Sequence, residues 1–192
     1  MSQRLQVLFD QALESALRVS EPHVSSHFAE TLRRLQPHVA SVTLARGLSP
    51  RTLCHGDAHT ANVFYPTSGD RSPEQLAVCD WQLMNVGRGV ADIVRFQMLS
   101  MALDERRAAA PRLAEAYVSE LEARGIAGYP LAAYERDFRL CTLFQAASMT
   151  IAFAAVDVST DRGQELVSVL LPRIATALED LGDISDVLDG LG

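Results

Sequence analysis

The sequence predicts a mainly helical α+β fold with a small β element around one polar loop. Apolar residues recur at helical spacing near the N-terminus and again from Val90 onward, which is typical of amphipathic helices. Between these regions lie short segments rich in β-branched, aromatic and other apolar residues. The chain has 192 residues and is 48% hydrophobic. That is enough for one sizeable core, so we expect one domain over residues 1–192.

Helices are expected along the first fifty residues, a lead-in that we place at residues 1–50. Apolar residues from Leu5 to Leu17 form one stripe of a helix that covers about the first twenty residues. A second helix is predicted over about residues 22–35. Pro37 suits the first turn of a shorter helix that ends at Gly47.

Residues 51–92 are expected to hold short strands and polar loops. The segments RTLCH, NVFY and QLAVCD favour β structure, and the turn-rich PTSGDRSPE separates the last two. From Val90 onward, helices are predicted near residues 90–102, 104–124, 131–156 and 162–181. Residues 93–192 are therefore expected to form a helical subdomain on the substrate side of the molecule.

Composition excludes several classes of protein. The formal net charge of −7 argues against a nucleic-acid binder, which would need a basic face. No apolar run approaches the roughly 18 to 20 residues that span a bilayer, and the polar start lacks the features of a signal peptide. We therefore expect a cytoplasmic protein without a membrane partner. All 17 basic side chains other than His are Arg, and the chain contains no Lys.

The stretch LCHGDAHTANVFY, residues 53–65, carries the most chemistry, and one interpretation of it is a metal hydrolase. In an extended segment, His55, Asp57 and His59 would project from one face. Two imidazoles and a carboxylate could then hold a catalytic Zn²⁺. However, Gly56 is unfavourable inside a strand, and this hypothesis gives Asn62 no purpose.

A second interpretation is phosphoryl transfer. Asn62 follows Asp57 by five residues, and Asp80 ends the apolar segment LAVCD after a predicted hairpin. Kinases use an Asp to orient the attacking hydroxyl, an Asn five residues later to hold Mg²⁺, and a further Asp to hold Mg²⁺ between the phosphates. This order favours Asp57 as the catalytic base and Asn62 and Asp80 as Mg²⁺ ligands.

These motifs, LCHGDAHTANVFY and LAVCDWQLMNVGRGVADI, resemble the catalytic core of the aminoglycoside phosphotransferase and choline kinase-like superfamily. The CDWQ segment is most similar to the ecdysteroid-kinase-like and related bacterial branches of this superfamily, and the likeness extends over about residues 50–180. The resemblance implies a protein-kinase-like large, C-terminal lobe. It also implies Mg²⁺ as cofactor, ATP as co-substrate, and a small hydroxylated molecule as acceptor.

The resemblance also implies roles for three further residues. His55 would be structural and hold the loop through backbone hydrogen bonds. His59 would donate to a phosphate oxygen, or else it is a solvated loop histidine. Asp92 resembles the family Asp that hydrogen-bonds the catalytic loop from the following helix, and its alternative is a carboxylate favoured by a helix N-terminus.

The small, sheet-rich lobe of such kinases has no counterpart in the sequence. No Gly-rich strand pair precedes LCHGD, and there is no Lys to pair with the phosphates. We therefore expect the small N-terminal lobe to be absent, truncated or supplied by another chain, and the chain alone to be inactive. The alternative is a non-catalytic kinase-like module that binds or interacts with other molecules.

Overall fold

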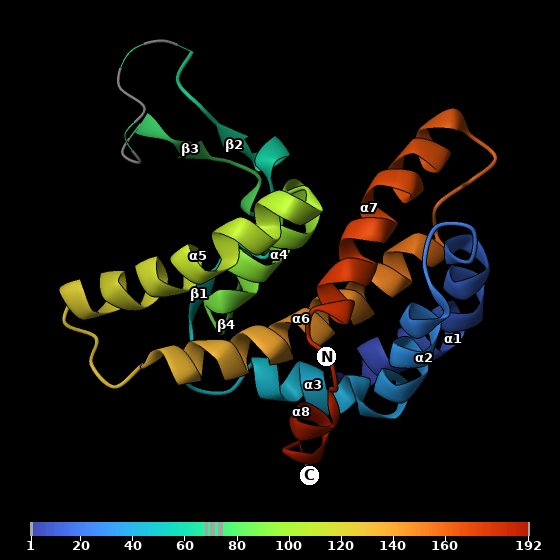
Figure 1. Cartoon of the computed structure of the whole chain (residues 1–192), viewed down its shortest axis with the longest axis horizontal. Helices are drawn as coiled ribbons and strands as arrows, with labels where there is room; N and C mark the ends of the chain where they lie inside the picture. The colour runs from blue at the N-terminus through green and yellow to red at the C-terminus, as the bar shows by residue number, and fades with distance from the viewer. Residues whose placement is uncertain (1, 68, 70–71, 73–74, 192) are drawn as a thin grey trace.

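The computed structural model describes residues 2–67, 69, 72 and 75–191. Most of this part is helical, with a few very short strands between the third and fourth α-helices (Figure 1). The mainly helical fold that the sequence predicts is confirmed. The elements in chain order are α1 (Ser2–Ser20), α2 (Ser26–Leu35), η1 (Gln36–His38), α3 (Val39–Arg46), β1 (Thr52–Cys54), η2 (Thr60–Asn62), β2 (Val63–Phe64), β3 (Ala77–Val78), η4 (Trp81–Leu83), β4 (Asn85–Gly87), α4 (Val90–Ser100), α5 (Leu103–Ala123), α6 (Leu131–Ala154), α7 (Asp161–Glu179) and α8 (Ser185–Asp189).

The predicted helices form, with some shifts at their ends. The second helix begins at Ser26, and not near residue 22, because residues 21–24 form a turn in which His23 N donates to Ser20 O at 2.8 Å. Pro37 lies in the 3-10 turn η1, which leads directly into α3. The short helix α8 was not predicted, because five residues are too few to show a helical period.

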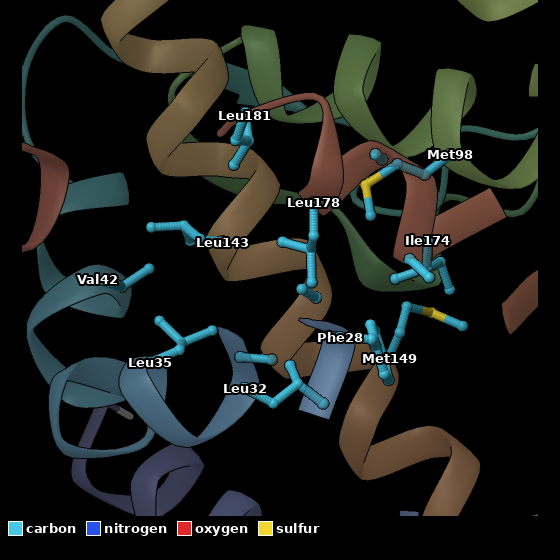
Figure 2. Close-up of a cluster of buried hydrophobic side chains, with 14 of the residues drawn as sticks. Phe28, Leu32, Leu35, Val42, Met98, Leu143, Met149, Ile174, Leu178 and Leu181 are labelled. Carbon is cyan, nitrogen blue, oxygen red and sulfur yellow. The ribbon is translucent and has the colours of Figure 1, made fainter. Parts of the chain in front are cut away.

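The core forms around α6, which packs against α1, α2, α3, α4, α5, α7 and α8. The buried apolar side chains of the core come from helices far apart in the sequence (Figure 2). They include Phe28, Leu32 and Leu35 from α2, Val42 from α3, Met98 from α4, Leu143 and Met149 from α6, and Ile174 and Leu178 from α7. The early helices therefore share a core with the later ones, so residues 1–50 do not stand apart from the rest of the chain.

Two antiparallel two-stranded ribbons interrupt the helices. β1 pairs with β4 so that Thr52 lies opposite Gly87 and Cys54 opposite Asn85, whereas β2 pairs with β3 through Val63 and Val78. Strands form in all three predicted segments. The fourth strand, β4, was missed, since a three-residue segment ending in Gly has no β-favouring pattern of its own and is extended by its pairing with β1.

None of the helices in the described part of the chain is both long and apolar enough to cross a membrane. The predicted turn between the second and third β-favouring segments lies mostly outside the described residues. The β2–β3 ribbon at its base extends away from the helices (Figure 1).

Candidate active site

The polar loop, residues 55–62, leaves β1 and is fastened to the first turn of α4. Asp92 Oδ2 accepts a hydrogen bond from His55 N at 2.7 Å, and Asp92 Oδ1 accepts one from Gly56 N at 2.9 Å. Gly56 has φ of +83°, and a Cβ there would lie 2.1 Å from Leu83 O. Only glycine fits this position, because any side chain would collide with backbone.

His55 holds the loop from inside. Its side chain is buried, Nδ1 accepts from Asp57 N at 3.2 Å, and Nε2 lies 2.8 Å from Cys79 O. Because Nδ1 accepts, Nε2 must carry the proton and donate to that carbonyl. The ring also packs 4.6 Å from the ring of Trp81, whose Nε1 donates to Val78 O.

These contacts leave neither nitrogen of His55 free for a metal ion. Among the described residues, moreover, no group of three His, Cys, Asp or Glu side chains is arranged to hold a metal. The geometry therefore does not support the hydrolase hypothesis, which needed His55, Asp57 and His59 as joint ligands.

Asp57 lies at the centre of the loop with both carboxylate oxygens in use. Oδ1 accepts from Arg95 Nε at 2.8 Å and from Arg95 Nη2 at 2.5 Å, whereas Oδ2 lies 3.3 Å from Asn62 Nδ2 and 3.6 Å from His59 Nε2. Burial by itself raises the pKa of Asp57, but Arg95, His59 and Asn62 together hold it below the usual value. Asp57 is therefore a fixed, ionised carboxylate at neutral pH.

Asn62 closes the loop on Asp57. Its side chain is buried, and Nδ2 donates to Asp57 O at 3.0 Å in addition to approaching the carboxylate. Its Oδ1 atom has no hydrogen-bond partner among the described residues. An amide oxygen left free beside a carboxylate is the kind of hard donor that Mg²⁺ prefers.

Asp80 follows the loop through the β2–β3 ribbon. Cys79 N donates to Asn62 O at 3.0 Å, and Cys79 O accepts from His55, so the residue before Asp80 is bonded to both ends of the polar loop. Asp80 itself has φ of 63° and ψ of 58°, and its side chain is exposed. It is the one non-glycine residue with positive φ in the described part of the chain. Such conformations cluster at functional sites, where the surrounding structure holds them.

Asn62 and Asp80 therefore fit a Mg²⁺ ion in their chemistry. Both present oxygen, Asn62 Oδ1 lacks another partner, and the carboxylate of Asp80 accepts only a long contact of 3.4 Å from Gln82 Nε2 among the described residues. His59 lies beside Asn62, with Nε2 3.3 Å from Asn62 Nδ2. The structure thus brings Asp57, His59 and Asn62 into direct contact, with His55 and Asp92 holding the loop from behind.

Arg95 is the site residue that sequence reasoning missed. It lies on α4 three residues after Asp92, a spacing that puts both side chains on one face of a helix. Asp92 accepts hydrogen bonds from the loop backbone, and Arg95 donates to the Asp57 side chain. Two residues on one face of α4 therefore hold the loop. The three-residue spacing from Asp92 could have indicated that Arg95 faces the loop, but only its contact with Asp57 shows its role in the site.

A protein-family model of the ecdysteroid kinase-like family matches residues 1–125. The chain belongs to the ecdysteroid kinase-like family. This family is part of the protein-kinase-like and aminoglycoside phosphotransferase superfamily, which confirms the resemblance seen in the sequence. The match includes the polar loop, Asp80 and α4. It begins earlier than the expected residue 50 and ends at residue 125, before the expected residue 180. No curated protein and no solved structure matches the chain.

Proposed function

We propose that the chain is the large lobe of an ATP-dependent phosphotransferase that transfers the γ-phosphoryl group to a hydroxyl of a small molecule. The observation that carries the proposal is the direct contact of Asp57 with Asn62 in a loop that Cys79 bonds to the segment ending at Asp80. The chain also belongs to the ecdysteroid kinase-like family, and the kinase-like fold of that family suits such a reaction.

Asp57 would act on the acceptor. Its carboxylate would accept a hydrogen bond from the substrate hydroxyl and take up the proton as oxygen attacks the γ-phosphorus and the bond to the ADP oxygen breaks. Arg95 would hold that carboxylate ionised and fixed in direction. His59 would lie near the transferring group and donate to one of its oxygens.

Asn62 and Asp80 would hold Mg²⁺ together with the phosphates of ATP. Magnesium bound there supplies neutralisation of the negative charge on the phosphate oxygens. The left-handed backbone of Asp80 is consistent with this role, because it turns the carboxylate in a direction that an ordinary strand end would not. Asp92 and His55 would act only by holding the loop.

The proposal also covers what residues 1–192 can do without a further segment or partner. The chain has no Lys for the α- and β-phosphates, and preorganised charge at the phosphates is a large part of catalysis by kinases. We therefore propose that a small lobe, on a further segment or another chain, completes the site, and that this chain alone binds Mg²⁺-ATP weakly without useful turnover.

A non-catalytic binding module is the second candidate, and one contact favours it. Both Arg95 nitrogens lie on Asp57 Oδ1, the kind of atom that an acceptor hydroxyl would approach. In a binding module this ion pair would simply stabilise the loop. The two candidates differ in whether Asp80 is needed for nucleotide binding.

Metal-nucleotide binding tests the proposal without requiring turnover. Mn²⁺, which replaces Mg²⁺ and enhances water-proton relaxation when bound to protein, should be titrated as Mn²⁺-ATP into the purified chain. Enhancement should be seen at high ligand concentration and be lost in Asp80→Asn. Asp189→Asn is the matched control, because Asp189 is exposed at the end of α8 and has no partner among the described residues.

A phosphoryl-transfer assay over a panel of hydroxylated small molecules should run beside the titration. Where turnover is measurable with a small lobe supplied, Asp57→Ala should lower it far more than it weakens nucleotide binding, whereas Asp80→Ala should impair both. Equal enhancement by wild type and Asp80→Asn would favour the binding module and refute the assigned metal site.

A further inference from the structure

A cavity lies at the end of the β1–β4 ribbon away from the polar loop. The loop leaves β1 after Cys54, whereas the cavity begins at Thr52, the other end of that strand, and at Gly89 beyond β4. The ends of α3 and α5, the start of α6, and α8 form the rest of its wall. Its volume is about 820 Å³, within the range of roughly 300 to 1,000 Å³ that is usual for small-molecule sites.

The charged lining of this cavity is positive. Arg88 pairs with Asp137, and Arg139 Nη2 lies 2.7 Å from Asp186 Oδ1, so these four charges compensate one another. Arg51 and Arg136 also line the cavity, and neither has an ion-pair or hydrogen-bond partner among the described residues. The lining therefore keeps two uncompensated positive charges in a chain whose net charge is −7.

One polar atom in the wall also lacks a partner. Tyr117 on α5 is half-buried, and its hydroxyl forms no hydrogen bond with any described residue. Its neighbour Tyr129, in contrast, donates to Asp137 Oδ2 at 2.7 Å. Burial raises the pKa of Tyr117, so its hydroxyl stays protonated and available as a donor.

The remaining wall is mainly aliphatic. It includes Leu48, Pro50, Leu121, Ile126, Leu140 and Val187. An apolar wall with a few hydrogen-bond donors and two unpaired arginine side chains suits a ligand that has an apolar body and one anionic group. A free phosphate ion or sugar would leave the apolar wall wet, and a neutral hydrocarbon would leave both arginines without a partner.

We propose that this cavity binds an amphipathic organic anion, with its acidic group between Arg51 and Arg136 and its apolar body along α5 and α6. Tyr117 would donate to a polar atom of the same ligand. The site is distinct from the polar loop, although Arg88 and Gly89 of its wall lead directly into α4. It does not depend on the proposed phosphoryl transfer.

Octanoate is a suitable probe, and its binding can be monitored in ¹H–¹⁵N correlation spectra of the whole chain. Titration should shift the amide signals of Gly89, Gly128 and Ala133, which line the cavity, and leave those of the β2–β3 ribbon in place. Arg51→Gln with Arg136→Gln should weaken binding about tenfold, because two charge-assisted contacts are lost. Both side chains are exposed and unpaired, so the double variant should keep the fold.

Three controls make the experiment decisive. Arg112→Gln, an exposed and unpaired Arg on α5 outside the cavity, should bind octanoate as the wild type does. Octanamide, with the same chain and no charge, should bind at least as poorly as octanoate binds to the double variant. Octyl phosphate should bind like octanoate if the site reads anionic charge and not carboxylate shape.

Several results would overturn the proposal. Octanoate binding that is unchanged in the double variant, or matched by octanamide, would remove the role of the arginines. Shifts confined to the β2–β3 ribbon would place the ligand on another surface. No shift with octanoate at any soluble concentration would mean that the cavity does not bind this class of ligand.

Discussion

Asp80 adopts a left-handed backbone, with φ of 63° and ψ of 58°, which costs a residue with a Cβ atom about 1 to 2 kcal/mol. Nothing in its immediate backbone pairing requires this, since the β2–β3 ribbon ends at Val78. The strain and the exposed carboxylate occur at the residue proposed to hold Mg²⁺. Strain at a functional side chain is commonly kept because the side chain is needed there.

The strain can be measured by comparing Asp80→Gly with Asp80→Ala. Glycine accepts positive φ without a Cβ clash, so Asp80→Gly should be more stable than Asp80→Ala by about 1 kcal/mol. Urea unfolding at pH 7 gives both values. Two variants of equal stability would mean that the backbone at residue 80 relaxes, and the argument from strain would fail.

Arg95 and Asp57 are joined by two short contacts between side chains that are largely buried, with 18% and 15% of their surface exposed. A double-mutant cycle with Arg95→Met and Asp57→Asn should therefore give a coupling free energy of about 1 to 3 kcal/mol in unfolding. The matched cycle of Arg95→Met with Asp189→Asn should be additive within about 0.5 kcal/mol. Additivity in the first cycle would contradict the ion pair.

At the scale of elements, α5 and α7 are tied through Asp180, which follows the last turn of α7. Arg106 Nη2 lies 2.7 Å from Asp180 Oδ2, and Arg107 donates to both carboxylate oxygens. Arg106 is buried, with 5% of its surface exposed, so its charge depends on Asp180 for compensation. Removing one member of a buried charge pair leaves the other uncompensated.

Asp180→Asn should therefore lower the free energy of unfolding at pH 7 by about 2 kcal/mol. Burial tends to raise the pKa of Asp180, but its bonds with Arg107 and Arg106 hold it below the usual value. A lowered folded pKa gives stability that is present above the unfolded pKa of about 4 and is lost as the pH falls through the folded value.

The difference between wild type and Asp180→Asn should accordingly shrink as the pH falls below about 4. Urea unfolding from pH 7 to pH 2.5 measures it, with Asp189→Asn as a surface control that should stay within about 0.5 kcal/mol of wild type. A difference that is independent of pH would show that Asp180 acts through packing and not through its charge.

At the scale of the whole molecule, half of the large apolar side chains that are exposed in the described part come from the segment that holds the polar loop and the two ribbons. Of the eighteen large hydrophobic residues that are exposed in the described part, nine come from residues 53–86. We call these nine the apolar loop surface: Leu53, Phe64, Tyr65, Leu76, Val78, Trp81, Leu83, Met84 and Val86. Apolar surface concentrated in this way marks a contact with another protein segment or a tendency to associate.

The isolated chain should therefore self-associate as its concentration rises. Sedimentation velocity over a concentration series should show this, and Phe64→Ser with Met84→Ser should shift the chain toward monomer. Val7→Ser is the control, because Val7 is 53% exposed on α1 and is not one of the nine residues of the apolar loop surface. A wild-type chain that stays monomeric throughout would show that this surface is tolerated in water.

Much of the fold could be predicted because its signals are local. The stripe from Leu5 to Leu17 and the helical period after Val90 depend on neighbours three and four residues away. The family match confirms the resemblance carried by the LCHGD and CDWQ stretches. The roles of Asp57, Asn62 and Asp80 stay predictions, although their spacing alone was enough to nominate them.

What only the tertiary structure decided depends on residues far apart in the chain. Arg95 reaches Asp57 across 38 residues, and His55 reaches Cys79 across 24. The strand β4 exists because β1 lies beside it, and the cavity lined by Arg51 and Arg136 forms where α3, α5, α6 and α8 meet. Such contacts follow from how helices pack around α6, and packing is set by the summed fit of many side chains. No local pattern encodes that sum, so the sequence determined the helices, the loop and its family, while packing decided which charges meet.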